Sequence, residues 1–473
     1  MQPINIQSRL ELFVDDELIE TVSEPASRRL HSPQPREVAF VFDQPWEGNS
    51  CGYVTVLRDA NFYRMYYRAS HATYQTDGYV DRIEFACMAE STNGIHWRRP
   101  ELDLHEALGH RGSNVLLTPN TGGAAVHNLS PFLDPRKDTP DSERYKALGG
   151  DKENLCAFAS GDGIHWDRIG DGPVITTGYF DSQNVAFWDG EREEYRAYTR
   201  DFNHGRDIRT CTSKDFRQWT EPKLLEYTPD RVSELYTNQI QPYHRAPHIL
   251  LGFPTRYVER QWQAATDYLP HPEYRRLRGR KSQREGTAVT DCMFMTSRDR
   301  HRFHIWEESF LRPGLWRRDG WFYGDGYKSL GLIETPSQHD PGIPELSFFV
   351  SEGSFQPTHA RLRRYSIRLD GFVSVWAPLR GGEVLTRPLL FSGNKLLINY
   401  STGAAGSVRV EVQDRDGVPI PGYTIEDAEE MFGDSLEQPV LWRHGFDVGS
   451  LQGKPVKLRF VLADADLYSL RFC

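Results

Sequence analysis

The sequence predicts an almost entirely β protein, a five-bladed β-propeller followed by a β-sandwich. A phrase that ends in tryptophan recurs along the chain, and repetition at a coarse period is typical of repeat architectures. Aromatic residues make up 12% of the chain, and 39 glycines and 29 prolines separate short stretches of alternating apolar and polar residues. Such a composition favours short strands joined by turns. The 473 residues also exceed what one hydrophobic core usually organises.

The repeated phrase marks the end of each predicted blade. Its clearest copies are Ser91–Trp97, Ser160–Trp166 and Ser213–Trp219, a looser copy runs from Ser297 to Trp306, and a degenerate one from Arg368 to Val375. In each copy a polar turn leads toward a large apolar residue that can cap the neighbouring repeat. Five copies therefore predict five blades.

Each predicted blade is a meander of short strands. Blade three is the clearest, because the Asp189-Gly190 pair between its first two strands is a strong hairpin signal. A long insertion, Tyr257–Gly286, interrupts blade four, and a segment of that length is usually functional or disordered. The expected strands, blade by blade, are Cys51–Leu57, Phe62–Arg68 and Arg82–Glu90; Val126–Leu133, Tyr145–Leu148 and Leu155–Ser160; Val185–Trp188, Tyr195–Thr199 and Ile208–Thr212; Leu235–Tyr243, His248–Pro254 and Thr287–Thr296; Tyr327–Glu334, Glu345–Ser351 and Arg361–Ile367.

Three segments of the chain follow from this pattern. We expect residues 1–40 to form an N-terminal hairpin and a ring-closing segment, residues 41–376 to form the propeller, and residues 377–473 to form the sandwich. Alternating residues between glycine-rich turns indicate the sandwich.

The charge pattern argues against several classes of partner. The net charge is −10, with acidic and basic residues interspersed, so we expect neither a nucleic acid nor a membrane as a partner. The start of the chain lacks the pattern of a signal peptide and no stretch has the length of a membrane span, which predicts a cytoplasmic protein. The basic run Arg275–Lys281 is interpreted as a solvated loop, with a polyanion contact as the alternative.

The six cysteines are scattered along the chain. Cys87, Cys156, Cys211 and Cys292 each come shortly before a repeated serine, in the strand that closes a blade. No two cysteines have the spacing of a metal or redox site. We therefore expect structural thiols and no required cofactor or metal.

This blade organisation resembles that of the five-bladed propeller glycoside hydrolases, the superfamily that contains families 32, 43, 62, 68 and 117. The resemblance covers residues 40–376, and the C-terminal segment is similar to the sandwich of family 32. It implies a carbohydrate substrate, and it leaves room for a calcium ion on the propeller axis. It also implies acidic side chains at the starts of the innermost strands, pointing into a central funnel.

Within this resemblance Asp181 matches the general acid of family 32. That family places an acidic motif eight residues before an Asp-Gly turn, and Asp181 lies eight residues before Asp189. The general acid protonates the departing glycosidic oxygen. The alternative is that Asp181 caps a turn through its side chain.

The second carboxylate is expected in blade one. The family register falls on Ser50 or Cys51, which are not acids, and the favoured nearby carboxylate is Glu47. Glu234 and Asp325, at the predicted inner strand starts of blades four and five, are the other candidates. Polar and aromatic residues near the inner strand starts, together with Trp46 beside Glu47 and Arg256 at the far end of the second strand of blade four, are expected to contact the sugar. The others are His127, Asn128, Asn184, Asn238, Gln239 and Tyr323.

The resemblance implies an exo-acting glycoside hydrolase with an acid and a base or nucleophile. Two other functions stay open: a glycan-binding propeller without catalysis, because blades one and two lack the expected acids, and a phosphorylase, lyase or transglycosylase on the same scaffold. A phosphorylase would need a cluster of basic side chains in the funnel. Propellers host many chemistries, so the choice rests on the site and not on the blade number.

Overall fold

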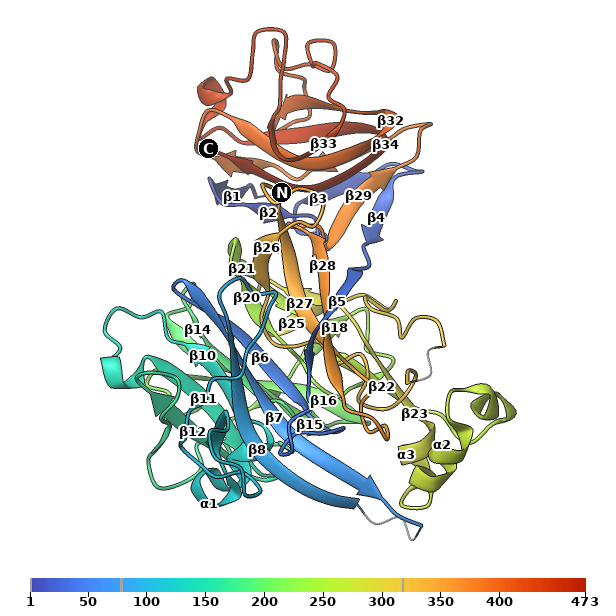
Figure 1. Cartoon of the computed structure of the whole chain (residues 1–473). Coiled ribbons are helices and arrows are strands. Elements are labelled where there is room, and N and C mark those ends of the chain that lie inside the picture. Colours follow the sequence, from blue (N-terminus) through green and yellow to red (C-terminus); the bar gives the residue numbers. More distant parts are fainter. Residues whose placement is uncertain (1, 77–79, 317–318) are drawn as a thin grey trace. The chain divides into compact units, whose positions relative to one another are not determined.

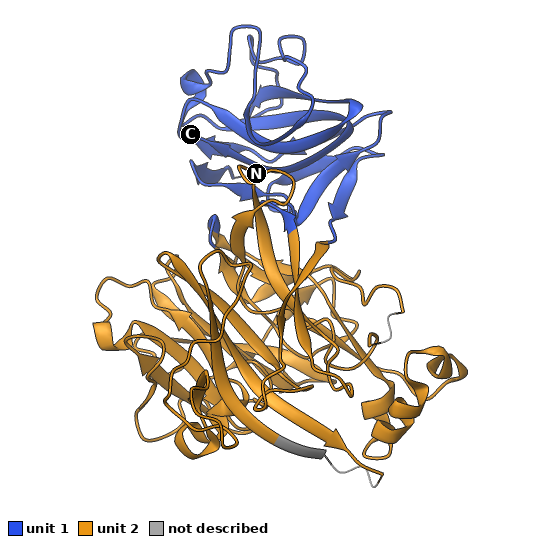
Figure 2. Cartoon of the chain, viewed as in Figure 1, with its two compact units in different colours: residues 1–32, 244–246, 367–473 blue, residues 33–243, 247–366 orange. Residues whose placement is uncertain are grey.

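The computed structural model describes residues 2–76, 80–316 and 319–473, and it consists almost entirely of β-strands (Figure 1). The chain divides into two compact units (Figure 2): residues 1–32, 244–246 and 367–473 form unit 1, and residues 33–243 and 247–366 form unit 2. The predicted fold class, an all-β propeller with a β-sandwich, is confirmed. Among the described residues, no helix is both long and apolar enough to cross a membrane.

Sheets one to three of unit 2 are four-stranded meanders that follow the chain in order, as the predicted blades require. Their strands are antiparallel neighbours. They are β6 (Gly52–Asp59), β7 (Phe62–Tyr74), β8 (Val80–Ser91) and β9 (Val115–Leu117); β10 (Ser130–Leu133), β11 (Tyr145–Gly150), β12 (Leu155–Ser160) and β13 (Asp167–Ile169); β14 (Val185–Asp189), β15 (Glu194–Phe202), β16 (Arg206–Ser213) and β17 (Lys223–Leu224).

The fourth blade is divided into two sheets. Pro254, which has no N–H to give to a strand ladder, separates the long segment into β21 and β22. The larger sheet contains β18 (Glu226–Thr228), β25 (Arg302–Ile305), β24 (Met295–Ser297), β21 (Ala246–Gly252) and β20 (Gln241–Tyr243). The smaller sheet contains β19 (Glu234–Leu235), β22 (Thr255–Glu259) and β23 (Ala288–Cys292), and the long insertion connects its last two strands.

The fifth sheet is completed by a strand from the N-terminal part of the chain. It contains β26 (Ile333–Pro336), β27 (Pro344–Glu352) and β28 (Arg361–Arg368), and β5 (Gln34–Val41) pairs antiparallel with β28. Residues 34–41 therefore close this sheet, whereas β2 (Glu11–Leu12) and β3 (Ile19–Val22) pair within the sheet of unit 1.

Unit 1 is built around two long strands, β32 (Leu396–Asp414) and β34 (Val456–Phe472), which pair antiparallel. The N-terminal strands β1 (Ile4–Gln7) and β4 (Ser27–Leu30) join the same ten-stranded sheet, as does β29 (Val373–Ala377). Trp442, one of the largest fully buried side chains in its core, donates its indole N–H to the Val410 carbonyl at 2.9 Å. This one core unites the two ends of the chain.

The tryptophan phrase forms the same hydrogen-bonded turn in four of its copies. The serine hydroxyl donates to an Asn or Asp side chain two residues later and accepts the N–H of the residue after that. The residue that follows the Asn or Asp has φ between 64° and 75°. The serines are Ser91, Ser160, Ser213 and Ser297, and their acceptors are Asn93, Asp162, Asp215 and Asp299. The phrase is thus an Asx turn repeated for a local structural reason.

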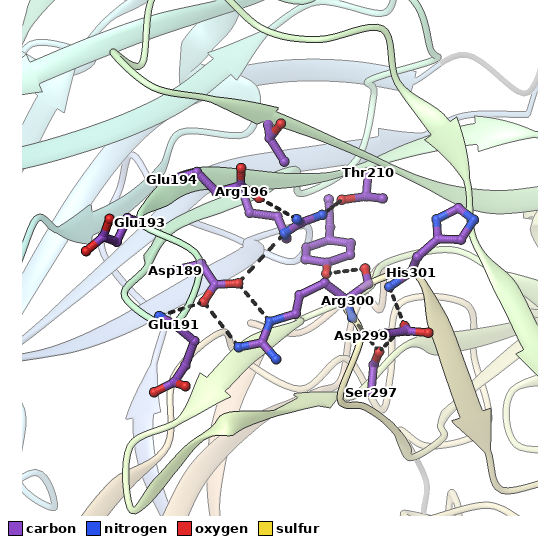
Figure 3. A network of polar contacts seen from close by, with 12 residues as sticks. Asp189, Glu191, Glu193, Glu194, Arg196, Thr210, Ser297, Asp299, Arg300 and His301 are labelled. Atoms are coloured by element: carbon purple, nitrogen blue, oxygen red, sulfur yellow. Dashed lines mark hydrogen bonds and ion pairs between the residues drawn. The ribbon is translucent and has the colours of Figure 1, made fainter.

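Contacts between consecutive sheets hold the ring of unit 2 together. Trp97 of the first turn packs edge-on against Phe349 of the fifth sheet, and Trp166 of the second turn against Tyr66 of the first sheet. A buried aspartate at the end of each of the first three inner strands binds the next sheet. These pairs are Asp59 with Arg144 and Tyr145, Asp134 with Tyr195, and Asp189 with Arg300, the last at 2.8 Å (Figure 3).

The repeated turn predicts a difference between two substitutions. Asp299 Oδ1 accepts the Ser297 hydroxyl at 3.2 Å and the N–H groups of His301 and Arg302 at 2.9 and 2.7 Å. Asp299→Ala removes these acceptors and should lower the melting temperature by about 2 °C, the shift for roughly 1 kcal/mol in a large domain. Asp299→Asn should stay near the wild type, because Asn93 makes the same turn in sheet one.

The stability lost on substituting Asp299 with alanine is expected to depend on pH. Burial would raise the pKa of Asp299, but the hydrogen bonds from His301 and Arg302 lower it. The contribution of Asp299 is therefore present above the pKa of the unfolded chain and is lost as the pH falls through the folded-state pKa. Thermal melts of the wild type and Asp299→Ala should converge in acid, and an undiminished difference there would contradict this role.

Candidate functional site

Buried Asn or Asp side chains fix the starts of the inner strands of unit 2. Four of them accept a hydrogen bond from a backbone N–H of the second strand of their own sheet, or of the segment just after that strand. We call these four residues, together with Asn238, the axial clamp. The accepting pairs are Asn49 with Ala72, Asn128 with Gly150, Asn184 with Arg200, and Asp325 with Ser354, at 2.8–3.2 Å. Asn238 accepts the N–H of Ile240. The clamp also crosses between sheets, because the amides of Asn49, Asn128 and Asn238 donate to carbonyls of neighbouring sheets.

Residues that flank the clamp in sequence line one cavity of about 290 Å³. His127 precedes Asn128, Asp181 lies three positions before Asn184, and Tyr236 lies two before Asn238. Every blade of unit 2 contributes to the cavity. Its charged residues are Arg68, His127, Lys152, Asp181, Lys281, Arg284 and Glu285, and its aromatic residues are Tyr53, Tyr74, Tyr236, Tyr323, Tyr327 and Phe355.

The long insertion forms one wall of this cavity. It contains α2 (Pro272–Gly279) and α3 (Gln283–Thr287), which lie together at the end of β22 and β23 (Figure 1). Lys281, Arg284 and Glu285 come from it. The insertion also contacts the β7–β8 hairpin, since Tyr74 donates its hydroxyl to Glu285 at 3.2 Å.

The interpretation of the basic run as a solvated loop is wrong for Arg275 and Arg278, which lie in α2, whereas Arg276, Arg280 and Lys281 are exposed. Arg275 and Arg278 have no exposed surface. Arg275 donates to the carbonyls of Pro270, Gly286 and Trp321, and burial together with Arg278 lowers its pKa to about 10. Carbonyl groups thus surround Arg275, whereas Arg278 pairs with the Glu285 carboxylate at 3.3 Å.

Two carboxylates line the cavity among the described residues, and each is paired with an arginine behind it. Asp181 forms an ion pair with Arg200, whose side chain is 3% exposed. Glu285 lies 3.3 Å from Arg278 and 3.9 Å from Arg284. Both carboxylates are held in place by charge, and Asp181 is the more accessible, with 30% of its side chain exposed.

A cluster of tyrosines forms the aromatic part of the cavity. The Tyr323 hydroxyl donates to the Tyr236 hydroxyl at 2.8 Å, and the rings of Tyr323 and Tyr327 both lie 5.7 Å from that of Tyr236. The guanidinium groups of Arg200 and Arg206 lie 5.1 and 5.3 Å from the Tyr236 ring.

The pKa values of the phenols in this cluster are shifted in opposite directions. Burial raises the pKa values of Tyr53, Tyr323 and Tyr327. Burial acts on Tyr236 in the same direction, but the Arg200 charge and the Tyr323 hydrogen bond outweigh it and lower its pKa. Separated pKa values in one site are typical of groups that exchange protons.

Tyr236 should therefore ionise before Tyr53, Tyr323 and Tyr327. In an ultraviolet titration of the folded protein, Tyr236→Phe should remove a tyrosinate signal that appears below the ordinary tyrosine pKa of ~10. Tyr323→Phe should move this signal to higher pH, because the donor to the Tyr236 oxygen is gone. An unchanged early signal in Tyr236→Phe would show that another tyrosine produces it.

Three of the residues predicted from the sequence line the cavity: Asp181, His127 and Tyr323. Four others belong to the axial clamp, namely Asn128, Asn184, Asn238 and Asp325, and their polar atoms bind backbone groups. Gln239 donates to the Gln183 side chain at 2.6 Å.

Glu47 and Trp46 lie in the core beside sheet one and not at the cavity. The Glu47 side chain has no exposed surface; Arg99 donates to it at 2.9 and 2.7 Å, and Tyr67 at 2.5 Å. Trp46 donates its indole N–H to Asn114 at 2.9 Å. The nearby arginine thus neutralises Glu47 inside the fold.

The other two predicted residues also form ion pairs outside the cavity. Glu234 lies 2.7 Å from Arg206 and lines a separate depression with Asp207 and Arg231. Arg256 binds Asp291 across β22 and β23, with a distance of 2.9 Å between its Nε and Oδ1. In the described part of the chain, no group of three or more His, Cys, Asp or Glu side chains is placed to hold a metal ion.

Several cavity residues were not among the predicted site residues, including Arg68, Lys152, Tyr236, Lys281, Arg284 and Glu285. Tyr236 could have been found from its position two residues before Asn238, at a predicted strand start. Three of the others lie in or beside the long insertion, whose length was the available signal.

No protein-family model matches this sequence, and no curated protein matches it. Solved structures resemble it at low identity. A GH32 β-fructofuranosidase from Bombyx mori is 10% identical, covering 93% of this chain and 94% of its own, with a TM-score of 0.43. An N-acetylgalactosamine deacetylase from F. plautii, in complex with blood group B trisaccharide, is 13% identical, covering 73% and 95%, with a TM-score of 0.43.

A third structure comes from the GH130 family of mannoside phosphorylases, which contains glycoside hydrolases that target β-1,2 mannosidic linkages in Candida mannan. It is 11% identical, covering 71% of this chain and 94% of its own, with a TM-score of 0.41. Glycoside hydrolases are thus among the solved structures that this chain is similar to. At these identities the likeness concerns the fold, and the substrate has to be inferred from the cavity.

Proposed function

We propose that this protein is a glycoside hydrolase that cleaves a terminal sugar from a glycan in the axial cavity of unit 2. The observation that carries the proposal is the cavity itself, in which two carboxylates from different parts of the chain share a lining with tyrosine rings and hydroxyls. Hydrolysis of a glycosidic bond needs such a pair of carboxyl groups, and aromatic faces with hydroxyls suit a sugar ring.

The size of the cavity supports an exo-acting enzyme. Ligand pockets usually occupy ~300–1,000 Å³, and this one, at about 290 Å³, lies at the lower limit. It suits one terminal sugar better than an internal segment of a chain.

We assign the two carboxylates different roles. Asp181 is in an ion pair with Arg200, which suits it to act as base or nucleophile. We assign Glu285, which accepts from Tyr74 at 3.2 Å and lies 3.3 and 3.9 Å from Arg278 and Arg284, the role of the acid that protonates the leaving oxygen. This assignment differs from the one implied by the family resemblance, which makes Asp181 the acid.

Activity assays on matched variants test the pair. Asp181→Asn and Glu285→Gln should each lower kcat/KM for sugar release by about a hundredfold or more, the usual effect of losing an acid or base. Glu273→Gln is the control, because Glu273 is an exposed carboxylate of the same insertion, paired with Arg276. The substrates are oligosaccharides with neutral and with acidic terminal sugars.

Sugar release that persists in both cavity variants would contradict the proposal. Release that is lost in Glu273→Gln as well would indicate damage to the insertion instead of loss of an acid. Circular dichroism and melting of all three variants distinguish these cases.

A further inference from the structure

We propose that the cavity binds an oxyanion together with the sugar. The oxyanion is a carboxylate or sulfate group on the terminal sugar, or an inorganic oxyanion bound beside it. This inference rests on the proposed function, because it names the substrate class of the same site.

The charges that line the cavity differ in sign from those of the whole chain. The chain carries a net charge of −10. The cavity has four permanent cations, Arg68, Lys152, Lys281 and Arg284, against the carboxylates Asp181 and Glu285. Those two carboxylates already have partners behind them, Arg200 and Arg278. Arg68 lies 3.9 Å from Glu84, and Arg284 lies 3.9 Å from Glu285. Among the described residues, the cations of the lining without a carboxylate partner are therefore Lys152 and Lys281.

Two of these cations are available to a ligand. Lys152 and Lys281 are exposed, and among the described residues neither has a carboxylate within 4 Å. Lys152 lies in the turn between β11 and β12, and Lys281 lies between α2 and α3. Two ammonium groups without a carboxylate partner among the described residues, from separate parts of the fold, thus line one cavity, where each would attract an anion.

A buried arginine adds a fixed donor to the same lining. Arg68 is 7% exposed, its ring partner Tyr53 lies 4.6 Å away, and its Nη2 donates to the Ser50 carbonyl at 2.9 Å. Its Nε has no hydrogen-bond partner among the described residues. An unpaired buried N–H is costly and is normally satisfied by water or a ligand. Arginine and lysine donors on an oxyanion form short, charge-assisted hydrogen bonds.

The pattern differs from that expected for a neutral sugar. A neutral ring can be bound by hydroxyl, amide and aromatic contacts, and cations gathered around it repel one another with no anion to offset them. In this cavity the nearby amides are used by the axial clamp, and the lining presents cations, phenols, His127 and two carboxylates that are already paired with arginines. The lining is therefore complementary to a ligand that is both ring-shaped and negatively charged.

Binding measurements test this without requiring turnover. The probes are glucose, glucuronic acid, glucose 6-sulfate and inorganic phosphate, titrated calorimetrically into the full-length protein at low and at physiological salt. At least one of the three anions should bind at least tenfold more tightly than glucose, and its affinity should fall as salt rises.

Variants of the free lysines identify the site. Lys152→Met and Lys281→Met should each weaken anion binding by about fivefold, which corresponds to the loss of one solvent-exposed charge pair of ~1 kcal/mol. Lys137→Met, at an exposed lysine that does not line the cavity, should leave the affinity unchanged.

The probes also distinguish the source of the anion. Tight binding of glucuronic acid or glucose 6-sulfate with weak binding of phosphate places the charge on the sugar, whereas tight binding of phosphate alone indicates a free oxyanion. Equal affinity for glucose and the three anions, or no binding of any anion, would overturn the inference. If the protein binds anions but releases no sugar, the hydrolase proposal is contradicted and the anion-binding inference stands. If it hydrolyses only neutral glycans, the anion-binding inference is contradicted and the hydrolase proposal stands.

Discussion

The anchoring of five inner strands at one axis is the constraint on which the rest of unit 2 depends. The strand starts converge there, and their backbone groups are out of reach of water. The axial clamp solves this with one buried Asn or Asp per blade, which accepts a backbone N–H and, as an amide, donates to backbone carbonyls. An Asn is suited to this because it offers both donor and acceptor. A ring of satisfied amides leaves the flanking positions free to face a cavity.

The charge distribution of the cavity follows from this arrangement. The clamp uses its side chains on backbone groups, and the carboxylates that line the cavity are Asp181, which precedes the clamp residue of its blade, and Glu285 of the long insertion. Both are bound to arginines that are buried or nearly so. The remaining lining is rich in cations and phenols, and the pKa of Tyr236 is lowered by the Arg200 charge. A single cavity therefore unites acids, cations and aromatic rings, although the surrounding protein is acidic.

Much of the fold could be predicted from the sequence, because the repeated Asx turn is a local structure that leaves a local pattern. The residues of the site were harder to predict. Asn128 and Asn184 were correctly placed at strand starts, but an amide there can serve a ligand or the backbone, and only the three-dimensional partners decide. Glu47 looked available beside Trp46, yet Arg99, 52 residues later, neutralises it in the core. The insertion was recognised by its length, but nothing local indicated that Lys281 and Glu285 meet Asp181.

The central claim is that the axial cavity of unit 2 holds the sugar. The most direct measurement is a crystal structure of the Asp181→Asn protein soaked with an oligosaccharide that ends in an acidic sugar. The account predicts the terminal ring beside Tyr236 and Tyr323, with its charged group within hydrogen-bond distance of Arg68, Lys152 or Lys281. A sugar bound elsewhere on the protein, with the cavity holding only water, would contradict it.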